Sequence, residues 1–169
     1  MITSGIAPGT AMQKTLLFVE TQLPIWRDMP GRPIAEGEED LNSQLCKFLN
    51  AAARSQNFSM AYFHHEERQT GRRRVDLSAL SPQPLIEGRS YFNLEPFLVL
   101  EGKRLPAPSN DREREYVTGT KTVSGGIERF KKGLHGASLR QAGMIAYIQN
   151  DSSEVWFPRI NSWIVGSLN

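Results

Sequence analysis

Four consecutive apolar residues, Phe97 to Leu100, run directly into the polar tripeptide Glu101-Gly102-Lys103. An apolar run of this length is typical of a strand that is buried inside a sheet. Because residues two apart on a strand point to the same face, Glu101 and Lys103 are expected to project together. The sequence therefore predicts a carboxylate and an ammonium group in one small site on a buried strand.

A second acidic residue follows an earlier strand-like segment. Asp76 lies between Val75 and Leu77, an apolar setting that is unusual for a carboxylate without a partner. If the two strands are neighbours, Asp76 and Glu101 supply two hard oxygen ligands for Mg²⁺ or Mn²⁺, and Lys103 supplies a cation that steers a water or a phosphate. This is the minimum apparatus for metal-assisted hydrolysis of a phosphodiester. The alternative interpretation is an ordinary ion pair between Glu101 and Lys103, with Asp76 as a turn residue.

Length and composition are those of one globular domain, with 169 residues, 39% hydrophobic and 22% charged. No apolar stretch approaches the roughly 18 residues needed to span a membrane. Residues 1–10 lack the pattern of an export signal. The single cysteine, Cys46, excludes an intramolecular disulfide and fits a reducing compartment. We therefore expect a cytoplasmic protein with no membrane partner.

The first 35 residues are interrupted by Pro24, Pro30 and Pro33, and we interpret residues 1–35 as an N-terminal extension with a strand or a short helix. From Glu36 to about Asn57, apolar residues recur at helical spacing behind an acidic first turn. This pattern predicts a helix, and we place the start of the main domain, 36–169, at its first residue.

The sequence after about Asn57 predicts three strands, a helix, a strand and a last helix. Strands are expected at 58–65 and 72–80 as a hairpin, at 97–103, and at 144–148. Apolar residues from Tyr116 to Leu134 recur at helical intervals, with a break expected near Gly125. The last helix is predicted to carry one apolar stripe: Val155, Trp156, Ile160, Trp163 and Ile164. The order helix, three strands, helix, strand, helix defines an α/β (α+β) protein.

This element order, together with Asp76, Glu101 and Lys103, resembles the PD-(D/E)xK nuclease superfamily over roughly residues 36–164. The resemblance implies a restriction-endonuclease-like αβββαβ core, with a four-stranded mixed sheet flanked by helices. We expect the site at one edge of that sheet, with Asp76 and Glu101 on adjacent strands. Two departures are Val75, where the family often has Pro, and Gly102, where many members have an apolar residue or Cys.

The resemblance also implies roles for individual residues. Asp76, Glu101 and the backbone carbonyl of Gly102 match the metal ligands, and Lys103 matches the residue that acts on the attacking water. Glu39, on the helix before the first strand, matches a further ligand and catalytic residue. Three neighbouring acids remain alternatives to Glu39: Glu36, Glu38 and Asp40.

The expected function is that of a divalent-metal-dependent nuclease that hydrolyses phosphodiester bonds of DNA, with RNA as the second choice of substrate. The resemblance implies a role in defence against foreign DNA or in repair. The net charge of +2 is small, but basic residues gather beside the acidic ones and are candidate phosphate contacts: Arg72, Arg73, Arg74 and Arg104. A homodimer or a partner protein is expected to supply specificity.

Two other functions fit the same residues. One is a non-catalytic nucleic-acid-binding or protein-interaction module on the nuclease-like scaffold. The other is a metal-dependent hydrolase of a small phosphorylated molecule.

Overall fold

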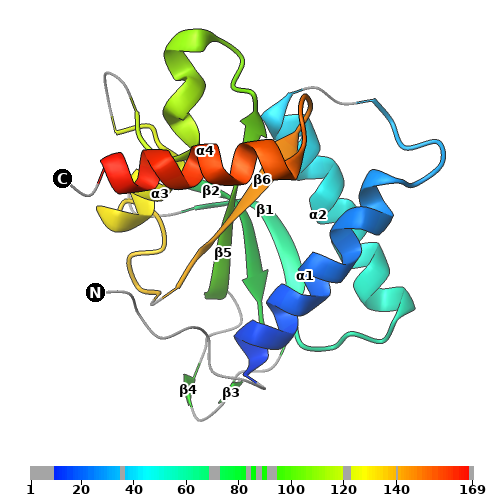
Figure 1. The fold of residues 1–169 in the computed structure, drawn as a ribbon. Coiled ribbons are helices and arrows are strands. Elements are labelled where there is room, and N and C mark those ends of the chain that lie inside the picture. Colours follow the sequence, from blue (N-terminus) through cyan, green and yellow to red (C-terminus); the bar gives the residue numbers. More distant parts are fainter. Residues whose placement is uncertain are drawn as a thin grey trace. The chain divides into compact units, whose positions relative to one another are not determined.

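The computed structural model describes residues 10–34, 37–68, 73–82, 85–86, 89–90, 95–119, 123–139 and 141–167. Its elements, in chain order, are α1 (Ala11–Arg27), α2 (Glu38–Ser55), β1 (Tyr62–Arg68), β2 (Arg74–Leu80), β3 (Leu85–Ile86), β4 (Arg89–Ser90), β5 (Pro96–Leu105), the 3₁₀ helix η1 (Asn110–Tyr116), α3 (Gly126–Lys131), β6 (Gly143–Ile148) and α4 (Ser153–Gly166) (Figure 1).

The principal sheet is mixed and has the strand order β1-β2-β5-β6. β5 and β6 run parallel, with Glu101 opposite Met144 and Lys103 opposite Ala146. The short strands β3 and β4 form a separate antiparallel pair. The predicted fold class is confirmed, because α2, β1, β2, β5, α3 and β6 follow one another in the αβββαβ order.

The chain divides into two units. The first contains Met1–His65 and Leu77–Leu98, and the second contains Glu66–Asp76 and Val99–Asn169. Strands β1, β2 and β5 therefore contribute residues to both units. Asp76 and the whole Glu101-Gly102-Lys103 segment belong to the second unit, whereas Glu39 belongs to the first.

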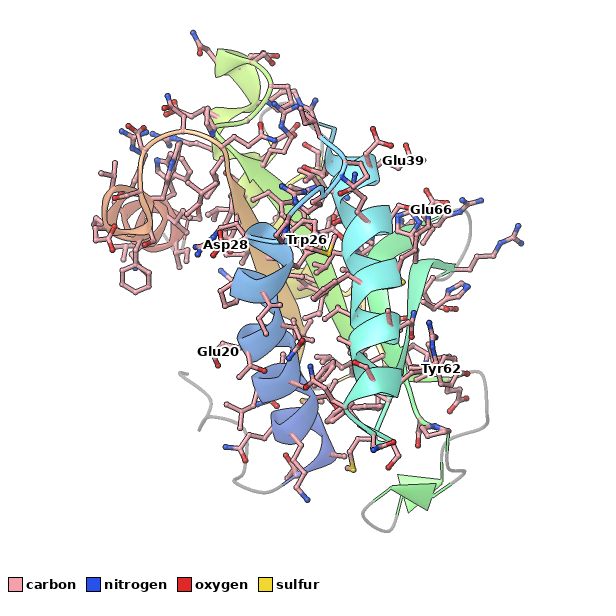
Figure 2. All side chains as sticks on the ribbon, turned by 90° about the vertical axis from the view of Figure 1, so that its right-hand side faces the viewer. Glu20, Trp26, Asp28, Glu39, Tyr62 and Glu66 are labelled. Carbon is pink, nitrogen blue, oxygen red and sulfur yellow. The ribbon has the colours of Figure 1, made fainter. Side chains whose placement is uncertain are left out.

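In the first unit, α1 and α2 lie side by side (Figure 1; Figure 2). The ring of Phe18 on α1 stacks on Phe58 with centroids 4.2 Å apart. Asn50 on α2 fixes the start of β1, since its Nδ2 donates to the carbonyl of Phe63 at 2.8 Å and its Oδ1 accepts from the Phe63 N–H at 2.9 Å. These contacts join the helices to the strand that follows them.

The expectation of a strand or short helix in residues 1–35 is wrong, because α1 is a helix of 17 residues. Thr10 caps its start by accepting a hydrogen bond from the Gln13 N–H. Pro24 lies near the end of the helix, where its missing N–H removes a single backbone bond. Burial of Phe18, Val19 and Trp26 stabilises the helix despite that loss.

The second unit has its own apolar cluster, formed by Leu105 at the end of β5, Val117, and Trp156 and Trp163 of α4. The two indole rings meet edge to face at 6.3 Å, and the Trp156 Nε1–H donates to the carbonyl of Asn150. Four of the five residues of the predicted apolar stripe belong to this cluster or pack against it, whereas Val155 is exposed.

The long helix predicted between Tyr116 and Leu134 is wrong in extent. Among the residues of this region that the structure describes, only the end of η1 and the six residues of α3 are helical, and α3 begins directly after Gly125. A Cβ at Gly125 would lie 2.3 Å from the backbone Cα of Thr118, so only glycine permits this close approach of the two segments. The predicted break near Gly125 is therefore confirmed.

Strand β6 forms one edge of the sheet, and its last four residues alternate between buried and exposed. Among the helices that the structure describes, none combines the length and apolar character needed to cross a membrane.

Candidate functional site

Glu101 and Lys103 lie in the middle of the sheet on β5, which is buried along almost its whole length. Glu101 is only 1% exposed and Lys103 only 8%. The prediction that Asp76 and Glu101 occupy adjacent strands is confirmed, since β2 neighbours β5. The prediction that the site lies at an edge is wrong, because β2 and β5 are the two central strands.

The side chain of Asp76 reaches the backbone of the neighbouring strand. Its Oδ2 accepts a hydrogen bond from the Gly102 N–H at 2.8 Å. That N–H belongs to the peptide group joining Glu101 to Gly102, so the Asp76 carboxylate lies beside the centre of the Glu-x-Lys motif. The structure thus places the Asp76 carboxylate against the backbone of Gly102, the residue between Glu101 and Lys103.

Glu101 is surrounded by basic groups from three segments. Its Oε1 lies 2.9 Å from Nη1 of Arg129 and 3.5 Å from Nζ of Lys103, and its Oε2 lies 3.1 Å from Nδ1 of His135. An ionised carboxylate is an acceptor, so this geometry assigns the proton of the imidazole to Nδ1. The buried carboxylate is therefore paired on both of its oxygens.

The environment lowers the pKa of Glu101 below its ordinary value. Burial acts in the opposite direction, because removal from water disfavours the charged form. The hydrogen bond from His135 and the charges of Lys103, His135 and Arg129 together outweigh burial. Glu101 is therefore ionised at neutral pH.

Arg129 and His135 are held in place by α3 and the turn after it. Gly133 and Gly136 both have positive φ, which lets the chain reverse around His135. The Leu134 N–H donates to the Arg129 carbonyl at 2.9 Å, which links the helix to the turn. This arrangement presents both basic side chains to Glu101.

Neither Arg129 nor His135 was expected at the site from the sequence. His135 is buried and paired with Glu101. A buried glutamate signals that cationic partners exist somewhere in the chain. No local pattern distinguishes Arg129 from the other basic residues of its helix.

A cavity of about 200 Å³ lies beside this cluster. It is lined by Arg73, Arg74, Val123, Arg129, Leu134 and His135. Arg73 and Arg74 are exposed at the start of β2, and Arg74 also pairs with Glu66. Two of the predicted phosphate-contacting arginines therefore share a cavity with two partners of Glu101.

Other predicted residues are placed elsewhere. Glu39 is exposed in the first turn of α2 (Figure 2), and it belongs to the first unit. Arg104 on β5 donates from Nε to the side-chain oxygen of Gln149 at 3.0 Å. Arg72 lies outside the described residues.

The acidic residues fit Mg²⁺ in donor type. Within the described part of the chain, no three His, Cys, Asp or Glu side chains gather as a metal-binding group. Mg²⁺ is commonly held by one or two carboxylates and keeps several waters, so Asp76, Glu101 and the Gly102 carbonyl are sufficient in number. Arg129 and His135 each engage one oxygen of Glu101, so a metal that binds Glu101 would share this carboxylate with both basic side chains.

Compared with protein-family models, with curated proteins and with solved structures, the chain showed no match.

Proposed function

We propose that this chain is a divalent-metal-dependent nuclease that hydrolyses phosphodiester bonds of DNA. The observation that carries the proposal is the 2.8 Å hydrogen bond from the Gly102 N–H to the Asp76 carboxylate, which joins an acid on one strand to the Glu-x-Lys segment of the next. Two carboxylates and an ammonium group are the groups that metal-assisted phosphodiester hydrolysis requires.

In the proposed mechanism, Asp76, Glu101 and the Gly102 carbonyl hold Mg²⁺ or Mn²⁺, and the metal supplies an activated water and charge neutralisation at the phosphate. Lys103, whose Nζ lies 3.5 Å from Glu101, orients the attacking water and stabilises negative charge in the transition state. Arg129 and His135 hold Glu101 ionised and oriented before the substrate arrives.

The remaining parts of the proposal concern partners and setting. Arg73, Arg74 and Arg104, with Arg72, contact the phosphates of DNA, and RNA is the second choice of substrate. A second copy of the chain or a partner protein supplies sequence specificity, and the protein acts in the cytoplasm in defence or repair.

The test is cleavage by the purified full chain. Plasmid, linear and single-stranded DNA are incubated with Mg²⁺, Mn²⁺, Ca²⁺ or EDTA, beside an Asp76→Asn preparation purified identically. We expect cleavage with Mg²⁺ or Mn²⁺, none with EDTA, and none by the variant. Equal cleavage by the wild type and the variant would indicate a contaminating nuclease and leave the proposal without support.

A second candidate is a non-catalytic nucleic-acid-binding module. It is favoured by the pairing of both Glu101 oxygens with basic side chains, which is also the pattern of a structural ion cluster.

Lys103→Ala separates the two functions. A nuclease loses single-turnover rate by orders of magnitude while its DNA affinity in Ca²⁺ changes only slightly, because Lys103 acts on the water and on transition-state charge. A binding module shows no cleavage in the wild type, and the change then alters affinity alone.

A further inference from the structure

The cavity lined by Arg73, Arg74, Arg129 and His135 has an unusual charge composition. Three guanidinium groups contribute to its wall, and none of the lining residues that the structure describes is acidic. The carboxylates that pair with Arg74 and Arg129 are Glu66 and Glu101, neither of which lines the cavity. The cavity itself therefore presents positive charge that its own wall does not neutralise.

The arginines keep donors available for a ligand. A guanidinium group has five N–H donors. The side chain of Arg129 is 30% exposed while its Nη1 contacts Glu101 at 2.9 Å, so this side chain is accessible to solvent and also paired. Planar guanidinium groups bind phosphate oxygens through paired hydrogen bonds.

A second cavity of the same unit provides a comparison. It has a volume of about 260 Å³, and its wall combines apolar residues with Glu128, Lys131 and Lys132. There the acid lies among the bases and neutralises part of their charge, since Lys132 pairs with Glu128 at 2.8 Å. Among the described lining residues of these two cavities, only those of the arginine-lined cavity lack an acid, and this favours an anion as its ligand.

We propose that this cavity binds a phosphate group, held by Arg73, Arg74 and Arg129 beside His135. The phosphate comes from the terminus or the backbone of a nucleic acid, and this assignment of its source rests on the proposed nuclease function. The binding of the phosphate does not depend on metal, because the arginine donors are already in place.

The test uses the full chain in EDTA at pH 7. Binding of inorganic phosphate is measured by calorimetry, and binding of a thymidine dinucleotide is measured with and without a 5′-phosphate. We expect saturable phosphate binding that weakens about tenfold or more in the Arg73→Gln/Arg74→Gln double variant. Preference for the 5′-phosphorylated dinucleotide identifies a terminal phosphate, and equal binding identifies a backbone phosphate.

The matched control is Arg112→Gln. Arg112 is 45% exposed and paired with Glu115, as Arg74 is 48% exposed and paired with Glu66, but Arg112 does not line the cavity. We expect the control to bind phosphate within about twofold of the wild type, since a surface pair contributes little elsewhere. No saturable binding by the wild type, or equal loss in the control, overturns the proposal.

Histidine resonances locate the site directly. The chain has three histidines, His64, His65 and His135, and only His135 lines this cavity. Titration with phosphate should shift the His135 signals and leave the signals of His64 and His65 unchanged. The His64→Asn and His65→Asn variants assign the signals of those two residues. Shifts confined to His64 or His65 contradict the proposal.

The outcomes distinguish this proposal from the proposed function. Phosphate binding in a chain that never cleaves DNA supports the phosphate site and removes the nuclease. Metal-dependent cleavage without phosphate binding supports the nuclease and removes the phosphate site.

Discussion

Glu101 is a buried carboxylate whose ionisation depends on its neighbours. Removing its charge leaves Lys103, Arg129 and His135 close together without their shared anion. We expect Glu101→Gln to destabilise the protein by about 3–5 kcal/mol, the usual cost of breaking a buried ion pair. Urea unfolding measures this loss. Glu113→Gln is the control, since Glu113 is half exposed and 3.9 Å from Arg159, and it should cost at most about 1 kcal/mol.

The same residue gives the stability a pH dependence. The pKa of Glu101 is lowered by folding, so its contribution is complete above the unfolded-state value of about 4.3 and is lost as the pH falls through the lower folded-state value. We expect the difference in free energy of unfolding between wild type and Glu101→Gln to narrow only in acid. Urea unfolding at a series of pH values from 7 to 3 measures this difference. A difference that stays constant to pH 3 would contradict the assignment of the charge to Glu101.

Asp76 offers a cleaner test of chemistry than Glu101. The amide oxygen of Asn can still accept the hydrogen bond from the Gly102 N–H, so Asp76→Asn should keep the fold and lose only the negative charge. We expect Mg²⁺-dependent cleavage to fall at least about a hundredfold, measured under single turnover. Asp111→Asn, an exposed acid of η1, should cleave at the wild-type rate. Full activity in Asp76→Asn would remove Asp76 from the site.

At the scale of elements, the short helix α3 carries Arg129 and depends on a tight contact at Gly125. A Cβ there meets the backbone of Val117 and Thr118, which cannot rotate away. We expect Gly125→Ala to cost about 1–3 kcal/mol and to weaken phosphate binding by displacing α3. Thermal melting measures the first effect. The control is Gly166→Ala, because a Cβ at Gly166 meets nothing within 4 Å, and its effect should stay within about 0.5 kcal/mol.

Elements with a strong local pattern were predictable from the sequence. Helix α2 is specified by the helical spacing of its apolar residues and by its acidic first turn. Strand β5 is specified by its apolar run. Neither prediction needs tertiary information. The helix α1 was missed because Pro24 argues against a long helix, whereas burial of Trp26 stabilises it. The region from Tyr116 to Leu134 has helical spacing, but a close backbone contact at Gly125 decides its conformation.

The candidate site was predictable only where its residues lie on strands. Asp76, Glu101 and Lys103 could be placed together because strand alternation and element order fix their positions. Arg129 and His135 approach Glu101 through a short helix and a turn with positive φ at Gly133 and Gly136. Such a turn sets the direction of the chain by tertiary contacts, which no local spacing reveals.

At the scale of the whole molecule, three strands pass through both units. Loss of either unit removes part of β1, β2 and β5, so we expect both to unfold in one transition. Tryptophan fluorescence tests this, because Trp26 lies in the first unit and Trp156 and Trp163 lie in the second. A Trp26→Phe variant reports on the second unit, and a Trp156→Phe/Trp163→Phe variant reports on the first.

The mutations themselves shift stability. For each variant, the unfolding midpoint from fluorescence is therefore compared with the midpoint from far-ultraviolet circular dichroism of the same variant. Coincident midpoints for fluorescence and circular dichroism in both variants support one transition. Separate midpoints in either variant contradict it.

The interleaving of the units also limits how such a site is inherited. Asp76 precedes the segment Leu77–Leu98, which belongs to the first unit, and Glu101 follows it. A single crossover between two related genes anywhere in that segment separates the two acids, taking each from a different parent. Recombination therefore transfers both acids from one parent only when it also transfers the segment between them. Chimaeras joined within that segment would test whether the acids of different parents are interchangeable.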